Sequence, residues 1–289
     1  MKTLVRLVAA SLCAALLAAC AGNGLPANVP QSAVLSQMRH TAVSNIRASW
    51  SLLKIAGMYS PTGIALDLVG NVYVASYQRG TVTTIAKNGT KTIVATGLGG
   101  PFGIALYNGY MYVAEREVSR VVKIAPNGRV TQIGRTWAYP NDVAVDRAGN
   151  LYVTDSGLGV FKVARNGSII QLQPRFDFGA PYGVAVADDG TVYVTSVGND
   201  AVYEIPPQGP IVSIGSGWNS PFGVVVGKTG AVFVANFEAN EITEIQGGKM
   251  TQIRGRLGFG RPLYLTTDKS GDVFVTSHGK KAVFKLTPG

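Results

Sequence analysis

The sequence predicts an all-β fold, a six-bladed β-propeller of four-stranded antiparallel blades, and three observations support this prediction. A phrase led by proline occurs six times, each copy contains strand-like runs, and the N-terminal region supplies one run that the last copy lacks. A period of about 40 residues with four strands per period is typical of propeller blades. The six copies begin at Pro61, Pro101, Pro140, Pro181, Pro221 and Pro262.

Each repeat divides into four short runs that are rich in β-branched and aromatic residues, as strands are. In the first repeat these runs cover residues 64–66, 72–74, 82–85 and 91–94. Glycines such as Gly70 lie in the turn between the first two runs. Asn-Gly pairs join the third and fourth runs, and Asn-Gly favours two-residue hairpin turns in which both residues take positive φ. These pairs are Asn88-Gly89, Asn127-Gly128 and Asn166-Gly167.

The two ends of the repeat region predict how the ring closes. The last repeat stops after its third run, residues 282–286, whereas a strand-like run at 48–55 precedes Pro61. We expect this N-terminal run to pair with the C-terminal one and complete the last blade, which leaves no open sheet edge. The predicted propeller domain therefore covers residues 48–289.

The N-terminus has the features of a bacterial lipoprotein signal. Lys2 and Arg6 precede an uncharged apolar stretch, residues 7–19, that is too short to span a bilayer comfortably. It ends in Leu17-Ala18-Ala19-Cys20, which resembles a lipobox. We expect residues 1–19 to be a signal peptide, Cys20 to be lipidated, and residues 20–47 to be a flexible tether. The alternative is an ordinary signal peptide in which Cys20 is incidental.

These features predict a location in the bacterial cell envelope, with the domain in the periplasm or at the cell surface. The residue after Cys20 is Ala21, not an aspartate that would resemble an inner-membrane retention signal, so the outer membrane is favoured where two membranes exist. Cys13 falls in the signal peptide. The mature domain is therefore expected to have neither a disulfide nor a thiolate metal site.

The chain is basic, with 26 Lys and Arg against 16 Asp and Glu and a formal charge of +10. A basic surface can attract nucleic acid, anionic lipid or an acidic glycan. The cations are mostly scattered singly, however, and no cluster resembles a nucleic-acid motif. We therefore expect no nucleic-acid partner and a monomeric domain.

The repeated phrases, such as Pro61-Thr62-Gly63-Ile64-Ala65 and Gly70-Asn71-Val72-Tyr73-Val74-Ala75, resemble those of the NHL-repeat propellers. More broadly they are similar to the superfamily that holds the gluconolactonase and senescence-marker proteins and the streptogramin lyases. The resemblance covers about residues 48–289. Its motifs are structural, so it implies the fold and says little about the function.

Residues that depart from the repeated phrases are the candidates for a functional site. Propellers place ligands on the face where the first runs begin, around the central channel. One ring of positions there follows each proline: Thr62, Phe102, Asn141, Tyr182, Phe222 and Leu263. A second ring follows the second run: Ser76, Glu115, Asp155, Ser196, Asn236 and Ser277.

Three departures in these rings predict ligand-binding residues. Charged residues replace small polar ones at Glu115-Arg116-Glu117, and Asn141-Asp142 replaces the usual x-Gly. Aromatic residues at Phe102, Tyr182 and Phe222, together with polar groups such as Asn236, suit a sugar, a peptide or another amphipathic ligand. The alternative is that the aromatic rings only plug the channel.

The gluconolactonase resemblance implies a divalent cation held by a Glu, an Asn and an Asp. Asn141 matches the Asn, but Tyr182 stands where the Asp is expected, and Tyr59-Ser60 stand where the Glu is expected. Without two anionic ligands, a hard cation would lose most of its oxygen shell. We therefore predict no metal and no cofactor, and interpret Asp155 as a residue that hydrogen-bonds loop backbone.

The streptogramin lyase resemblance implies a seven-bladed ring with a His and Glu acid/base pair. This chain has only His40, in the tether, and His278, on the expected ligand face. His278 could act as a general base beside Glu115, Asp155 or Glu238. No Gly-x-Ser-x-Gly elbow, cysteine nucleophile or phosphate-binding glycine loop is present.

The sequence thus favours a membrane-anchored, non-catalytic recognition module for a glycan, peptide or protein partner. Two alternatives stay open: a hydrolase or lyase at the channel mouth that uses His278, and a structural protein of the cell envelope.

Overall fold

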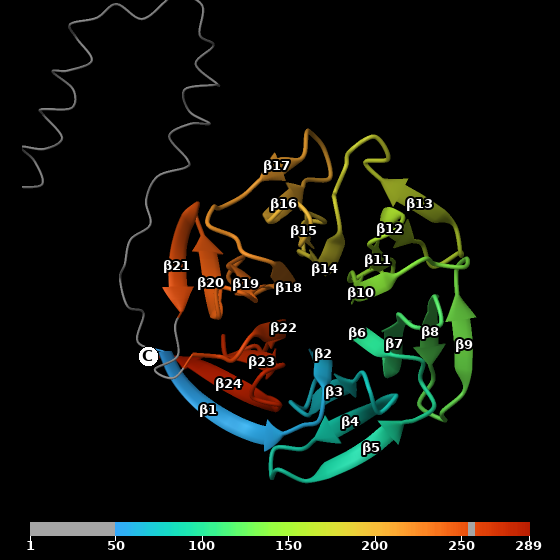
Figure 1. The fold of residues 1–289 in the computed structure, drawn as a ribbon. Helices are drawn as coiled ribbons and strands as arrows, with labels where there is room; N and C mark the ends of the chain where they lie inside the picture. The colour runs from blue at the N-terminus through green and yellow to red at the C-terminus, as the bar shows by residue number, and fades with distance from the viewer. Residues whose placement is uncertain (1–49, 254–257) are drawn as a thin grey trace, which may run out of the picture. The chain divides into compact units, whose positions relative to one another are not determined.

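The computed structural model describes residues 50–253 and 258–289. They form six four-stranded antiparallel sheets, arranged as the blades of a propeller around a central channel (Figure 1). This confirms the predicted fold class. The innermost strand of each blade begins at the repeated proline, and we number blades 1 to 6 by these strands: β2 (Pro61–Leu66), β6 (Pro101–Tyr107), β10 (Pro140–Val145), β14 (Pro181–Val186), β18 (Pro221–Val226) and β22 (Pro262–Thr267).

The remaining strands follow outward in each blade. The second strands are β3 (Val72–Ser76), β7 (Tyr110–Glu115), β11 (Leu151–Asp155), β15 (Val192–Ser196), β19 (Val232–Asn236) and β23 (Val273–Ser277). The third strands are β4 (Thr81–Ile85), β8 (Arg120–Ile124), β12 (Gly159–Val163), β16 (Ala201–Ile205), β20 (Glu241–Gln246) and β24 (Ala282–Pro288). The outer strands are β5 (Lys91–Ala95), β9 (Val130–Ile133), β13 (Ile169–Leu172), β17 (Val212–Ser213), β21 (Lys249–Ile253) and β1 (Trp50–Gly57).

The ring closes in the way that the sequence predicts. Strand β1 pairs antiparallel with β24, from Trp50 opposite Pro288 to Gly57 opposite Ala282, and so supplies the outer strand of blade 6. The predicted signal peptide, Cys20 and the tether lie outside the described residues. No helix in the described ranges is long and apolar enough to cross a bilayer.

The antiparallel pairing gives the propeller two distinct faces. The start of each inner strand lies opposite the end of the second strand, as Pro61 does opposite Ser76. We call the face with these ends, and with the loops that follow the second strands, the upper face. The opposite, lower face carries the turns between the first and second strands and between the third and fourth.

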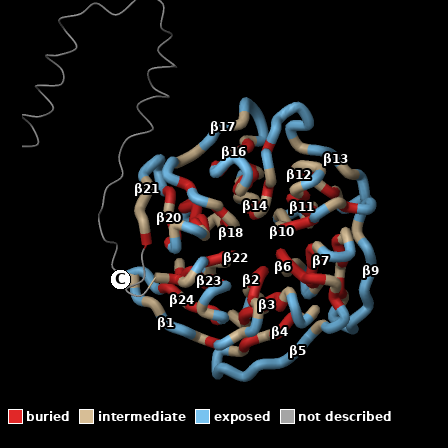
Figure 2. The backbone as a smooth tube through the Cα atoms, in the orientation of Figure 1, coloured by how far each residue is buried: buried red, intermediate tan, exposed pale blue. Residues whose placement is uncertain are grey.

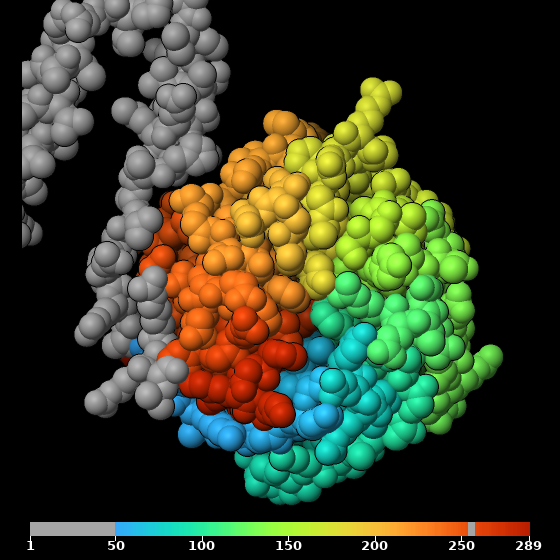
Figure 3. Space-filling model, in the orientation of Figure 1, coloured from blue at the N-terminus to red at the C-terminus, as the bar shows by residue number. Residues whose placement is uncertain are grey.

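The blades pack against one another through apolar side chains, and Figure 2 shows buried residues along the inner three strands and exposed residues along the outer strands. In Figure 3 the atoms of successive blades abut one another around the ring. A large apolar residue three positions before each proline wedges between neighbouring blades, a ring that the sequence analysis missed. Its members are Met58, Leu98, Trp137, Phe178, Trp218 and Phe259.

The Asn-Gly pairs at the lower face form a different turn from the predicted one. Gly89 has φ 84°, but Asn88 does not take positive φ. The Ala86 N–H donates to Thr90 O at 2.9 Å, so the loop has three residues and uses glycine at its last position. The two-residue turn with positive φ at both positions occurs instead at Asn108-Gly109, where φ is 48° and 78°.

Candidate binding site at the channel mouth

The inner strands approach one another so closely that the repeated x-Gly is a steric requirement. A Cβ on Gly63 would lie 2.4 Å from Phe102 O, and one on Gly183 would lie 2.3 Å from Phe222 O. Two repeats replace this glycine with a larger residue. These residues are Asp142, which was among the predicted departures, and Tyr264, which was not.

Tyr264 crosses the channel from blade 6 to blade 3. Its hydroxyl donates to Asn141 O at 3.1 Å, and its side chain is only 4% exposed. Its ring packs edge-on against Phe102 at a centroid distance of 5.7 Å. Burial, with the nearby Asp142 carboxyl, raises the pKa of Tyr264 well above its usual value, so the hydroxyl stays protonated and donates.

Phe102 packs beside Tyr264 and touches rings from other blades. It comes from blade 2, yet it also contacts Tyr77 of blade 1 at 5.8 Å and Tyr182 of blade 4 at 6.0 Å between ring centroids. Phe102 is 9% exposed. Phe102 is therefore packed among other rings, as in the alternative in which aromatic rings plug the channel, and the unpredicted Tyr264 is buried with it.

Other rings lie on this plug and remain partly exposed. Tyr182 contacts Phe222, and Phe222 contacts Phe237, each at 4.6 Å between centroids. These three residues are neither buried nor fully exposed. Together with Tyr77 and Phe102 they form a continuous aromatic surface, which we call the aromatic floor.

Charged side chains border the aromatic floor. Arg116 donates to Tyr182 Oη at 2.8 Å, and its guanidinium lies 5.2 Å from the ring centroids of both Phe102 and Tyr182. On the other side, Arg261 lies 5.4 Å from the Phe237 centroid and pairs with Glu238 at 3.2 Å. Cations over ring faces are attracted by the ring quadrupole, so they hold these rings in place.

The ring of positions at this surface is the first residue after each second strand, one position later than the predicted ring. The backbone N–H of each member donates to the residue that precedes a repeated proline. This repeated bond sets the side chains at the mouth. The members are Tyr77, Arg116, Ser156, Val197, Phe237 and His278.

Glu115 lies beneath the mouth and not on it. It is fully buried, accepts a hydrogen bond from the Gly99 N–H at 2.8 Å, and forms an ion pair with Arg120. Its carboxylate is not exposed, so the structure gives no support to its predicted role as a ligand-binding or catalytic residue. The sequence could have indicated this ion pair, because Arg120 lies on the adjacent third strand opposite Glu115.

Asp155 and Asn236 occupy the same structural position and also brace loops. Asp155 accepts hydrogen bonds from the backbone of Ala138 at 2.7 Å and Tyr139 at 3.1 Å, as the sequence interpretation expected. Asn236 accepts one from the Asn219 N–H at 2.8 Å. Both are buried, so the second ring fastens the connections between blades.

Asn141 and Asp142 are buried in the channel wall. Asn141 Nδ2 donates to Pro181 O at 2.8 Å, whereas its Oδ1 has no partner. Asp142 accepts hydrogen bonds from the backbone N–H groups of Val143 at 2.9 Å and Val184 at 3.0 Å. Burial raises the pKa of Asp142 to about 8, against these hydrogen bonds, which lower it.

The residues present do not fit the cation of the gluconolactonase pattern. Both carboxylate oxygens of Asp155 accept hydrogen bonds from backbone N–H groups. Tyr182, an aromatic residue, stands where the pattern has its Asp ligand. In residues 50–253 and 258–289, no group of three or more His, Cys, Asp or Glu side chains could hold a metal ion.

His278 lies at the mouth, exposed, with its ring centroid 6.3 Å from that of Phe237. Its backbone N–H donates to Arg261 O at 3.1 Å. Within the described part of the chain, no carboxylate forms a hydrogen bond or an ion pair with its imidazole. Glu238, an exposed carboxylate that was a candidate partner for His278, pairs with Arg261 instead.

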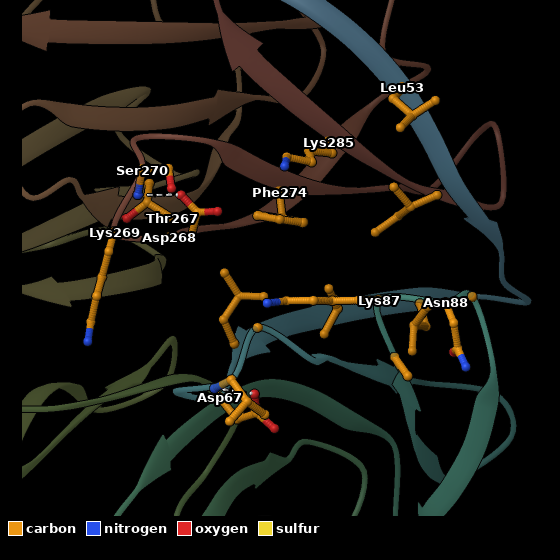
Figure 4. A pocket seen from close by; sticks show the side chains of 18 of the residues that line it. Leu53, Asp67, Lys87, Asn88, Thr267, Asp268, Lys269, Ser270, Phe274 and Lys285 are labelled. Carbon is orange, nitrogen blue, oxygen red and sulfur yellow. Dashed lines mark hydrogen bonds between the residues drawn. The ribbon is translucent and has the colours of Figure 1, made fainter.

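A cleft of about 780 Å³ lies toward the lower face between blades 6 and 1, lined by residues that include Leu53, Lys87 and Phe274 (Figure 4). Its two acidic residues accept hydrogen bonds from backbone groups of their own turns. Asp67 accepts from the Asn71 N–H at 2.8 Å, and Asp268 accepts from the Ser270 N–H at 2.8 Å. The cleft therefore presents no pair of free carboxylates for acid/base chemistry.

Comparison with protein families identifies the chain as a member of the Virginiamycin B lyase family, whose family model matches residues 45–281. The sequence analysis had not favoured this branch of the superfamily, because its His and Glu pattern is incomplete here. A comparison with curated protein sequences finds no match.

Solved structures with the same fold include members of both enzyme groups. A streptogramin B lyase is 16% identical, with a TM-score of 0.67 over 83% of this chain and 98% of that one. A gluconolactonase from Xanthomonas campestris is 16% identical, with a TM-score of 0.74 over 84% and 91%. A catalytically inactive His-to-Ala variant of virginiamycin B lyase from Staphylococcus aureus, solved with quinupristin, is 15% identical, with a TM-score of 0.63 over 83% and 99%.

Proposed function

We propose that this protein is a non-catalytic recognition module that binds an amphipathic ligand on the aromatic floor. The observation that carries the proposal is the unbroken run of partly exposed rings from Tyr182 through Phe222 to Phe237, stacked on a closed channel. Aromatic surface with a few fixed polar groups is typical of ligand sites.

The charged groups around the floor support binding more than catalysis. Arg116 and Arg261 are fixed over the rings and can meet a polar or anionic part of the ligand. Glu115 and Asp155 are buried and bound to backbone, and Glu238 is paired. A general base must accept a proton and lie within hydrogen-bond reach of the substrate proton that it removes. Neither buried carboxylate offers this at the mouth.

The first test is the thermal stabilisation of the protein by a ligand panel that includes quinupristin, measured as a shift in Tm. Tyr182→Ala and Phe222→Ala should each reduce the shift by more than half, because each removes a ring that contacts its neighbour in the floor. Phe176→Ala is the matched control: Phe176 is 38% exposed and belongs to another ring cluster, with Phe178 and Tyr203. An unchanged shift in both floor variants would rule out the floor as the binding site.

A lyase that acts at the same mouth is the second candidate. Family membership and the exposed imidazole of His278 favour it. In this case quinupristin incubated with the protein should change in chromatographic retention or mass, and His278→Ala should abolish that change. Unaltered quinupristin after long incubation with stoichiometric protein would argue against this candidate.

We also propose that a lipid on Cys20 anchors the propeller in the cell envelope, with the domain in the periplasm or at the cell surface. The support is the complete Leu17-Ala18-Ala19-Cys20 sequence after the apolar stretch. Cys20→Ser should move the protein from the membrane fraction to the soluble fraction after cell lysis. A variant that sediments with membranes as wild type does would contradict the anchor.

A further inference from the structure

A second cleft, of about 570 Å³, lies between blades 6 and 1 toward the upper face, and its lining does not include the aromatic floor. Segments that are distant in the sequence form it: the end of β1 with Tyr59, the blade 1 strands and loop with Arg79 and Lys91, and the blade 6 loop with Lys281. Closure of the ring by β1 brings them together.

Two cations of this cleft lie over one exposed ring, and a third is held at a nearby backbone carbonyl. The guanidinium of Arg79 lies 5.2 Å from the centroid of the Tyr59 ring, and Lys281 Nζ lies 5.6 Å from the same centroid. Lys91 Nζ donates to Gly57 O at 2.8 Å, two residues before Tyr59. The ring and the carbonyl thus fix the positions of cationic groups that would otherwise move freely on the surface.

No carboxylate of this chain neutralises the three cations. The cleft is lined by no Asp or Glu, and in the described ranges Arg79, Lys91 and Lys281 form no ion pair. The segments outside those ranges, 1–49 and 254–257, contain no Asp or Glu in their sequence. Like charges in one cleft repel one another, so an anion that enters it gains from all three.

Tyr59 is not required by the propeller fold. Its counterparts, two positions before the other repeated prolines, are small: Gly99, Ala138, Gly179, Asn219 and Gly260. Tyr59 is 46% exposed, so it does not serve the core. The large ring of Tyr59, which lies between two cations, therefore indicates a binding site and not a role in core packing.

We propose that this cleft binds an acidic glycan through its carboxylate or phosphate groups. The guanidinium fork of Arg79 matches the geometry of an oxyanion, and Lys91 and Lys281 add point charges. Hydroxyl groups of Thr81 and Thr83 and the exposed side chain of Ile93 also line the cleft, and they suit the hydroxyl groups and the apolar face of a sugar. This site is independent of the aromatic floor.

The test is calorimetric titration of the full chain with three probes: a hexuronate oligosaccharide, a neutral oligosaccharide of the same length, and inorganic phosphate. We expect the hexuronate to bind, the neutral sugar not to bind, and phosphate to bind at least tenfold more weakly than the hexuronate. Raising the ionic strength from about 0.05 M to about 0.5 M should weaken hexuronate binding about tenfold, because the charges are solvent-exposed. Equal binding of the neutral sugar, or of phosphate alone, would overturn the glycan assignment.

Variants locate the binding. Arg79→Gln and Lys281→Gln should each weaken hexuronate binding about tenfold, and Tyr59→Leu should weaken it while preserving apolar volume. Lys228→Gln, an exposed lysine in a lower-face turn, is the matched control and should leave binding unchanged. Tyr182→Ala should also leave it unchanged, which separates this site from the aromatic floor. Wild-type affinity in Arg79→Gln and Lys281→Gln would refute the site.

Discussion

Replacing Tyr264 with alanine is expected to lower the free energy of unfolding by about 3–5 kcal/mol, the usual cost of removing a buried aromatic side chain. Tyr264 is 4% exposed and packs against Phe102, so its removal leaves a cavity among buried side chains. Its ring also joins blade 6 to blade 3 through Asn141. Urea unfolding followed by circular dichroism measures the change.

The matched control is Tyr264→Phe, which keeps the ring and removes only the hydroxyl that donates to Asn141 O. It should cost about 1–2 kcal/mol, because one buried acceptor is left without a partner. If the alanine variant loses no more than the phenylalanine variant, the ring does not support the channel as described.

Asp142→Asn is expected to remove a destabilisation that appears as the pH rises. Burial raises the pKa of Asp142 to about 8, whereas an unfolded Asp has a pKa of about 3.9. The folded state therefore holds this proton more tightly. The stability linked to this proton is fully present below about pH 4 and is lost as the pH rises toward 8. At about 1.4 kcal/mol per pKa unit, the loss is at most about 5–6 kcal/mol.

The asparagine variant should therefore be more stable than wild type above pH 8. At pH 4–5 it should be less stable by about 1 kcal/mol, because its amide cannot accept both of the hydrogen bonds that Val143 and Val184 donate to Asp142. Urea midpoints at pH 5, 7 and 9 test this expectation. Parallel stability curves for the two proteins across this range would show that Asp142 stays ionised in the folded state.

The repeats made the fold predictable, because proline, glycine and the β-branched runs report local backbone requirements that recur six times. The same regularity exposed Phe102, Tyr182 and Phe222, which the structure places in the plug and the floor. Tyr264 escaped attention because it lies in an apolar stretch that resembles any buried strand, and only the missing glycine marked it. Its path across the channel depends on the closed ring, which no local pattern describes.

The charged candidates were harder to place, because sequence position does not give side-chain direction at the end of a strand. Glu115 and Arg116 are adjacent, yet Glu115 turns inward to Gly99 and Arg120 while Arg116 lies over the rings of the mouth. The cluster around Tyr59 was not predicted at all. Its members are far apart in the sequence, and they meet only because β1 closes blade 6 next to blade 1.

We propose that the aromatic floor, and not an acid/base pair at His278, is the functional centre of the upper face. The measurement is calorimetric titration of the panel ligand that stabilises the protein most into wild type, the double variant Tyr182→Ala/Phe222→Ala, and His278→Ala. The double variant should weaken binding at least tenfold, about 1.4 kcal/mol, whereas His278→Ala should change it less than threefold. Loss of binding in His278→Ala with wild-type affinity in the double variant would refute the floor as the functional centre.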